Sequence, residues 1–236
     1  MDQASSSAEV PHDMLYPEVL GLPGNYNFNG NLHAEDETAT LCGMKLNHEG
    51  IPSGVKDTVI GGIISVGQYA WAMTSKRSHD KASYPYWVKY QSKTNSDWAL
   101  CDIIHTLEVP NVNGSTRLIH YKKEADLPWI PGTVKVLAGR GEEFEAHLST
   151  GDGWGLGAFR GVKLIGLITQ LPKETIIPRG AWVVKDDSLC GYVVHCEPGT
   201  NGRVGYMAPI EQAFKEMKKI FKGKEPCFPN APPWTV

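Results

Sequence analysis

The sequence lacks both a strong net charge and a long apolar run. It holds 23 Lys and Arg against 26 Asp and Glu, which gives a formal net charge of -3. No basic field would therefore attract nucleic acid or a membrane surface. The longest apolar stretch, at 59–73, is interrupted by Gly, Ser and Gln, whereas a membrane-spanning helix needs about 20 apolar residues. We expect no nucleic-acid partner and no membrane partner.

Paired cysteine motifs and a secretory signal are missing as well. The five cysteines are irregularly spaced and form no Cys-X-X-Cys pair, so neither a disulfide framework nor a structural zinc site is expected. The N-terminal residues show no basic segment followed by an apolar one, as a secretory signal would. We therefore expect a cytoplasmic protein with free thiols, and we expect neither a metal nor another cofactor.

Helical periodicity is scarce, and short apolar segments separated by turn residues dominate. The 25 Gly and 16 Pro exceed the usual combined share of about 12%. Apolar runs or period-two alternation predict strands at residues 58–66, 69–73, 86–90, 99–103, 116–121, 133–138, 162–168, 182–184 and 191–195. The pattern favours an all-β body, built as a sandwich or a pair of barrels.

The segment 209–221 is the exception, because its apolar residues follow a helical period. Ile210, Phe214, Met217 and Phe221 recur at i, i+4, i+7 and i+11. A proline opens the segment, an acid comes early and a lysine pair comes late, as the helix dipole favours. The sequence therefore predicts one α-helix near the C-terminus.

Two motif-like features carry little chemistry. The glycine-rich stretch 151–161 has neither the Lys-Ser/Thr ending of a P-loop nor the strand and helix that flank a dinucleotide loop. His195 and Cys196 are adjacent, so their side chains would point to opposite faces of a strand rather than to one metal ion. We interpret them as a half-buried histidine and a core cysteine.

Three segments in one order are the most informative feature. They are VIGGIISVGQYAWAMTSK at 59–76, SDWALCDI at 96–103, and the stretch 176–209 with IPRGAWVV and CGYVVHCEPG. Together they resemble the trypsin-like (chymotrypsin-fold) serine protease family, most closely its intracellular fungal branch. The resemblance covers residues 38–222 and implies two six-stranded antiparallel β-barrels with a C-terminal α-helix. The implied organisation is an N-terminal tail (1–36), a first barrel (37–130), a second barrel (131–208), the helix (209–222) and a C-terminal tail (223–236).

The resemblance also implies that two of the three catalytic residues are replaced. The family's general base falls on Lys76, or on Arg77 if the register slips by one, whereas its orienting aspartate is retained as Asp97. Arg179 stands at the position of the nucleophilic serine. A guanidinium stays protonated and is no nucleophile, and a lysine is a base only when its pKa is strongly lowered. The usual serine protease triad is therefore absent.

If the fold holds, Lys76, Asp97 and Arg179 converge where the triad would lie. Two readings of this charge set remain open. It is either a structural salt-bridge cluster or a recognition site for a small anionic molecule, since two cations outnumber one carboxylate.

The neighbouring hairpin would supply the rest of a binding site. Val194, His195 and Cys196 match the family's substrate-backbone strand, and Gly180 matches the turn beside the nucleophile. These residues would line a groove whose main chain pairs with an extended peptide. A groove that is packed and closed by the chain's own tails is the equally open alternative.

The resulting hypothesis is a pseudoprotease that binds a peptide or a partner protein through the former substrate cleft. A first alternative is an enzyme of specialised metabolism, of isomerase, cyclase or lyase type, with Lys76 and Arg179 as electrophilic donors and Asp97 as a base. A second is a hydrolase with a displaced nucleophile. The candidates for that role are Ser149, Ser188 and Cys196, each with His147 or His195.

Overall fold

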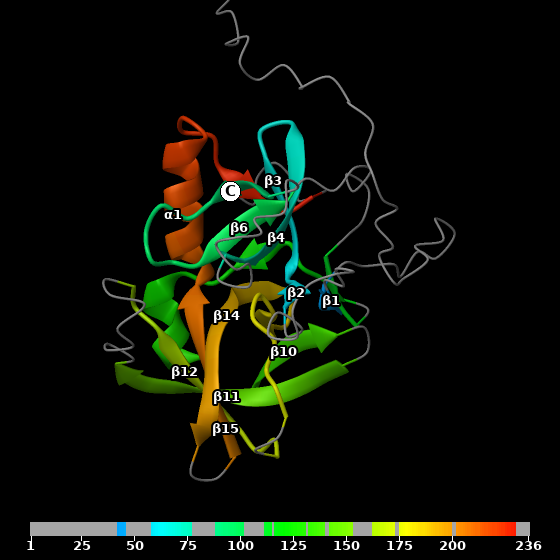
Figure 1. The fold of residues 1–236 in the computed structure, drawn as a ribbon, viewed down its shortest axis with the longest axis vertical. Helices are drawn as coiled ribbons and strands as arrows, with labels where there is room; N and C mark the ends of the chain where they lie inside the picture. Colours follow the sequence, from blue (N-terminus) through cyan, green and yellow to red (C-terminus); the bar gives the residue numbers. More distant parts are fainter. Residues whose placement is uncertain are drawn as a thin grey trace, which may run out of the picture.

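The computed structural model describes residues 42–45, 58–76, 88–101, 111–114, 116–130, 132–139, 142–152, 162–172, 175–199 and 202–229. Most of the described backbone is β-strand, and one α-helix lies near the C-terminus (Figure 1). In the described part of the chain, no helix combines the length and the apolar character that a membrane span requires. The glycine-rich stretch 153–161 lies outside the described residues.

The second half of the chain forms a closed six-stranded antiparallel barrel. Its strands are β10 (Val134–Gly139), β11 (Glu142–Asp152), β12 (Ile165–Thr169), β13 (Trp182–Lys185), β14 (Ser188–Gly199) and β15 (Gly202–Pro209). Their order is β13-β10-β11-β12-β15-β14, and a further pairing of β13 with β14 closes the ring. A short strand, β9 (His120–Tyr121), runs parallel to the start of β14. The predicted barrel of this half is confirmed.

The first half contains a five-stranded antiparallel sheet in the order β16-β3-β4-β6-β5. These strands are β16 (Pro226–Cys227), β3 (Gly62–Val66), β4 (Tyr69–Ser75), β6 (Trp98–Cys101) and β5 (Val88–Gln91). Two shorter pairs join β1 (Met44–Lys45) to β2 (Val59–Ile60) and β7 (Val112–Asn113) to β8 (Thr116–Arg117). Thus β16, which belongs to the predicted C-terminal tail, completes a sheet of the first half.

The helix α1 (Ile210–Ile220) begins directly after β15 and confirms the helix predicted from the periodicity. In Figure 1 it leaves the barrel and runs alongside the sheet of the first half. Its buried residues are Ile210, Ala213, Phe214 and Met217. The apolar stripe of the helix therefore packs into a core that contains residues of both halves.

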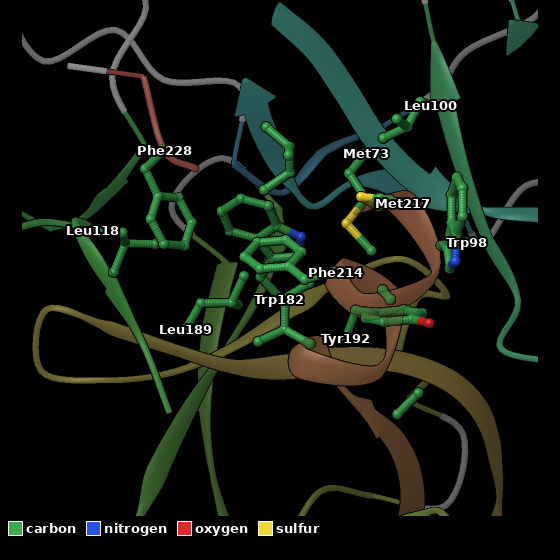
Figure 2. Close-up of a cluster of buried hydrophobic side chains, with 14 of the residues drawn as sticks. Met73, Trp98, Leu100, Leu118, Trp182, Leu189, Tyr192, Phe214, Met217 and Phe228 are labelled. Carbon is green, nitrogen blue, oxygen red and sulfur yellow. The ribbon is translucent and has the colours of Figure 1, made fainter. Parts of the chain in front are cut away.

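One apolar core joins both halves and the helix (Figure 2). It contains Met73, Trp98 and Leu100 from the first sheet, Trp182, Leu189 and Tyr192 from the barrel, and Phe214 and Met217 from α1. Trp182 packs directly on the backbone between β2 and β3, since a Cβ atom on Gly61 would lie 2.0 Å from its Cδ1 atom. The two halves are therefore held in a fixed relation by close packing.

The buried side chain of Asn111 acts as a strand partner for β3. Its Oδ1 atom accepts the Ile63 amide at 2.6 Å, and its Nδ2 atom donates to the Ile63 carbonyl at 2.7 Å. We expect Asn111→Ala to lower the free energy of unfolding by about 2–3 kcal/mol, because two buried backbone groups lose their partner. Urea unfolding measures this. The control Asn113→Ala removes one exposed 3.3 Å hydrogen bond, and an equal loss there would contradict the assigned role.

Candidate functional site

The three segments singled out in the sequence meet where β4 ends and β13 begins. Arg179 forms an isolated parallel bridge with Thr58, and its carbonyl accepts the Val59 amide at 3.0 Å. Gly180 follows with φ +84°, a conformation that favours glycine. A Cβ atom at Gly180 would lie 3.1 Å from the Ser75 amide nitrogen. The turn at Arg179 and Gly180 therefore lies directly against the end of β4.

Asp97 contacts the same end of β4 through its side chain and its backbone. The Ser75 hydroxyl donates to Oδ2 of Asp97 at 2.7 Å, and the Lys76 amide donates to the Asp97 carbonyl at 2.8 Å. Asp97 is 1% exposed and has φ +61°, a left-handed conformation that is uncommon for a residue with a side chain. The contacts on both sides of Asp97 therefore have to hold an unfavourable backbone in place.

The two predicted cationic positions have different surroundings. Lys76 is half-buried and its Nζ atom donates to the Ser92 carbonyl at 2.7 Å. Arg179 is also half-buried, and its backbone contacts Thr58 and Val59. The structure thus brings the three segments together, whereas direct pairing of the three charged side chains stays a prediction.

The predicted groove strand lies immediately beside the Gly180 turn. The Gly180 amide donates to the Val193 carbonyl at 2.8 Å, and the Val193 amide donates to the Ala181 carbonyl at 2.9 Å. Val194, the next residue, is fully buried, so only its main chain can face a ligand. His195 and Cys196 are half-buried, and the imidazole of His195 stacks on Tyr206 with the ring centroids 6.0 Å apart.

The two strands that flank β14 pair with it over different lengths. Its pairing with β15 continues to Gly199, whereas the register of β13 on β14 ends at Tyr192. A register shift interrupts the β14–β15 pairing between Val193 and His195. Among the described strands, none continues the pairing of β13 past Val193. This side of β14 is where an added strand would bind.

Tyr192 connects the barrel to the segment that carries Asp97. Its hydroxyl donates to the Ser96 carbonyl, one residue before Asp97. Complete burial raises the pKa of Tyr192 well above its ordinary value, and the negative charges of Asp97 and Glu216 raise it further. The hydroxyl therefore stays protonated and remains a hydrogen-bond donor.

Of the displaced nucleophile candidates, Ser188 does not form a triad through its hydroxyl contact, whereas Ser149 and Cys196 stay predictions. Ser188 is 3% exposed and its hydroxyl donates to Asp187 at 2.8 Å, whereas a triad requires a histidine in that place. Burial raises the pKa of the Cys190 thiol to about 12 and that of Cys101 well above its ordinary value. Both buried thiols are therefore poor nucleophiles.

Sequence reasoning missed Ser75, Tyr192 and Glu216, which contact Asp97 or the residues beside it. Ser75 and Tyr192 both lie within quoted motifs, which is a signal that the sequence offers, whereas Glu216 lies outside them. The described residues contain no group of three or more His, Cys, Asp or Glu side chains suited to a metal ion.

Comparison of the structure with solved proteins adds a finding on the fold. Protease A of Thermobifida fusca superposes with a TM-score of 0.52 over 72% of this chain and 91% of that one, at 13% sequence identity. The chain has a chymotrypsin-type fold. The predicted fold class is confirmed, and at this identity the similarity concerns the fold alone.

Two further solved structures are similar at a lower score. A glutamic acid specific serine protease that uses a histidine triad in substrate binding matches with a TM-score of 0.48, 10% identity, and coverage of 67% of this chain and 88% of that one. The chymotrypsin of Cellulomonas bogoriensis matches with a TM-score of 0.48, 10% identity, and coverage of 72% and 98%. No protein family and no curated protein matches the sequence.

Proposed function

We propose that this protein is a pseudoprotease of chymotrypsin-type fold that binds an extended peptide, free or as part of a partner protein, along β14. The observation that carries the proposal is the turn at Arg179 and Gly180. This turn is hydrogen-bonded to β2 on one side and to β14 on the other. The resemblance assigns the nucleophile to Arg179, and a guanidinium cannot attack a peptide bond.

Main-chain pairing would supply most of the affinity. The length of β14 that extends past β13 offers backbone donors and acceptors to an added strand, which is how exposed strands bind peptides. Val194 contributes only through its main chain because its side chain is buried, whereas His195 and Cys196 are partly exposed. The side chains next to this strand would then select among peptide sequences.

The local charge favours a peptide that carries a carboxylate. Arg179 is a half-buried cation beside β14. Lys76 and the Glu216 carboxylate both contact Ser92, and the Asp97 carboxylate already accepts the Ser75 hydroxyl. Arginine binds carboxylates with two parallel hydrogen bonds. We infer that an acidic side chain or a C-terminal carboxylate of the peptide binds at Arg179.

A peptide selection tests this function. Random peptides displayed on phage are selected on the immobilised protein, and the affinity of the best synthetic peptide is measured by calorimetry. We expect Arg179→Ala to weaken binding about 30-fold, or about 2 kcal/mol. The control Lys219→Ala changes an exposed lysine of α1 and should leave the affinity unchanged. Failure to select any peptide, or equal effects of the two variants, would contradict the proposal.

An enzyme of specialised metabolism that acts on a small anionic molecule is the second hypothesis from the sequence, and the Arg179 cation supports it in the same way. Native mass spectrometry of the purified protein distinguishes the two. A bound small molecule that is lost in Arg179→Ala would favour the enzyme. The fungal and cytoplasmic setting stays a prediction in either case.

A further inference from the structure

We propose that Glu216 of α1 is a positioning residue for this site, because its carboxylate fixes the segment that carries both Asp97 and the partner of Lys76. We call residues 92–98 the Asp97 loop. The inference rests on the proposed function, since it assigns Glu216 a part in presenting Lys76 and Asp97 to a ligand. It concerns a residue 120 positions away from Ser96 in the sequence.

The Glu216 carboxylate accepts hydrogen bonds along the whole Asp97 loop. Its Oε1 atom accepts the backbone amides of Lys93 at 2.7 Å and Thr94 at 3.1 Å. Its Oε2 atom accepts the Ser96 hydroxyl at 2.5 Å and the Trp98 indole at 2.9 Å. One carboxylate therefore holds the loop backbone and side chains on both sides of Asp97.

Two of these contacts lead directly to the site. Ser92 donates its hydroxyl to Glu216 at 3.0 Å, while its carbonyl accepts the Lys76 Nζ atom at 2.7 Å. Ser96 is held by Glu216 through its hydroxyl and by Tyr192 through its carbonyl. Asp97 follows Ser96 in the sequence. Lys76 thus binds a residue that Glu216 holds, and Asp97 is covalently joined to another one.

The backbone conformation of Asp97 explains why the loop needs these hydrogen bonds. A residue with a side chain at φ +61° stays in that conformation only when its surroundings determine it fully. Trp98 on one side and Ser96 on the other are buried and bonded to Glu216. Without the carboxylate, we expect the loop to relax and the contact between Asp97 and Ser75 to loosen.

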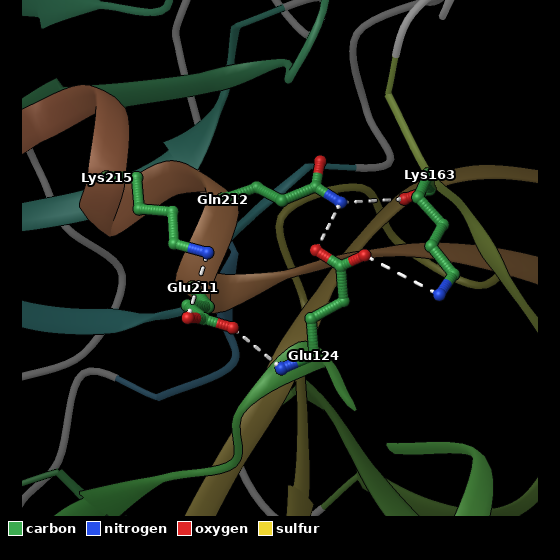
Figure 3. A network of polar contacts seen from close by, with 5 residues as sticks. All are labelled: Glu124, Lys163, Glu211, Gln212 and Lys215. Carbon is green, nitrogen blue, oxygen red and sulfur yellow. Dashed lines mark hydrogen bonds and ion pairs between the residues drawn. The ribbon is translucent and has the colours of Figure 1, made fainter. Parts of the chain in front are cut away.

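A matched control lies five residues earlier on the same helix. Glu211 is also on α1, but its carboxylate accepts the Glu124 amide at 2.8 Å and pairs with Lys215 at 2.9 Å (Figure 3). Glu124 begins the short 3-10 helix Glu124–Trp129, which precedes the barrel. Glu211 thus carries the same charge on the same helix as Glu216, but its contacts are with another part of the chain.

The test compares Glu216→Gln with Glu211→Gln by amide hydrogen exchange of the full chain. The Lys76 and Ser92 amides, which donate to Asp97 and Trp98 at 2.8 Å, should exchange at least about tenfold faster in Glu216→Gln. The Val193 amide in the barrel should be unchanged, and Glu211→Gln should leave all three unchanged. Uniform acceleration in Glu216→Gln, or the same local effect in Glu211→Gln, would overturn the proposal.

Affinity for the phage-selected peptide is the second readout, and it should fall about tenfold in Glu216→Gln only. Local acceleration with unchanged affinity overturns the positioning role. If no peptide can be selected, the proposed function fails, and the exchange data still decide whether Glu216 holds Lys76 and Asp97. If Glu216→Gln does not fold, Ser96→Ala removes the 2.5 Å contact with Glu216, together with the hydroxyl contacts to Ser92 and Thr94, and should accelerate the same two amides.

Discussion

Gly61→Ala is expected to lower the free energy of unfolding by roughly 3 kcal/mol, because overpacking a rigid core is strongly unfavourable. The added Cβ atom would lie 2.0 Å from Cδ1 and 2.1 Å from Nε1 of Trp182. Trp182 is fully buried, so its ring has no space into which to move. Chemical denaturation of the wild type and the variant measures the loss.

A control and a double variant make this prediction specific. At Gly205, an added Cβ atom meets only Ile177 and Leu167 side-chain atoms at 3.3 Å and 3.4 Å, so Gly205→Ala should be close to neutral. Phenylalanine lacks the five-membered ring that Gly61 approaches. Gly61→Ala should therefore be less destabilising by about 1 kcal/mol or more when Trp182→Phe is also present. Strict additivity would contradict the assigned contact.

Glu216→Ala is expected to destabilise the protein by roughly 3 kcal/mol near neutral pH, because several buried donors lose a charged acceptor. Ser92, Ser96 and Trp98 are each less than 4% exposed. The two serine hydroxyls also contact each other and Thr94, but these neutral contacts are weaker than those with the carboxylate. The loss should be measured by urea unfolding. Glu211→Ala is the comparison, since its carboxylate has a backbone partner and one exposed lysine.

The effect of Glu216 should also depend on pH in a defined direction. Burial raises the pKa of Glu216, but the hydrogen bonds from Ser96, Lys93, Trp98 and Ser92 outweigh it and hold the pKa below the ordinary 4.5. A lowered pKa stabilises the folded state above the unfolded value, and this stabilisation is lost as the pH falls through the folded pKa. The difference between wild type and Glu216→Ala should therefore shrink from about pH 7 to about pH 3. An unchanged difference would contradict the role of the charge.

Local patterns predicted most of the secondary structure but missed several strands, the long barrel strands β11 and β15 among them. The period of Ile210, Phe214 and Met217 gave the helix, because the core-facing side of a helix is continuous in sequence. The strand β11 was not predicted. Its apolar residues Phe144 and Leu148 alternate with acids and a histidine, so the segment has no apolar run. Only every second residue of such a strand points toward the barrel interior.

The sequence could predict which segments form the site, but not the contacts between residues that lie far apart in the chain. The resemblance located the three segments, and the structure brings Gly180, Ser75 and Asp97 together. The contacts of Tyr192 and Glu216 with Ser96 span 96 and 120 residues. Such contacts follow from how the helix and the barrel pack on the first half, and no periodicity or motif encodes them.

The most direct test of the account is a single mass-spectrometric experiment on the wild-type protein with its selected peptide. Amide exchange and the mass of the peptide are followed together over a long incubation. The account predicts protection of β14 in the stretch after Val193, with the peptide left intact. Cleavage of the peptide, or protection confined to a surface away from β14, would contradict the claim that this protein binds peptides without cutting them.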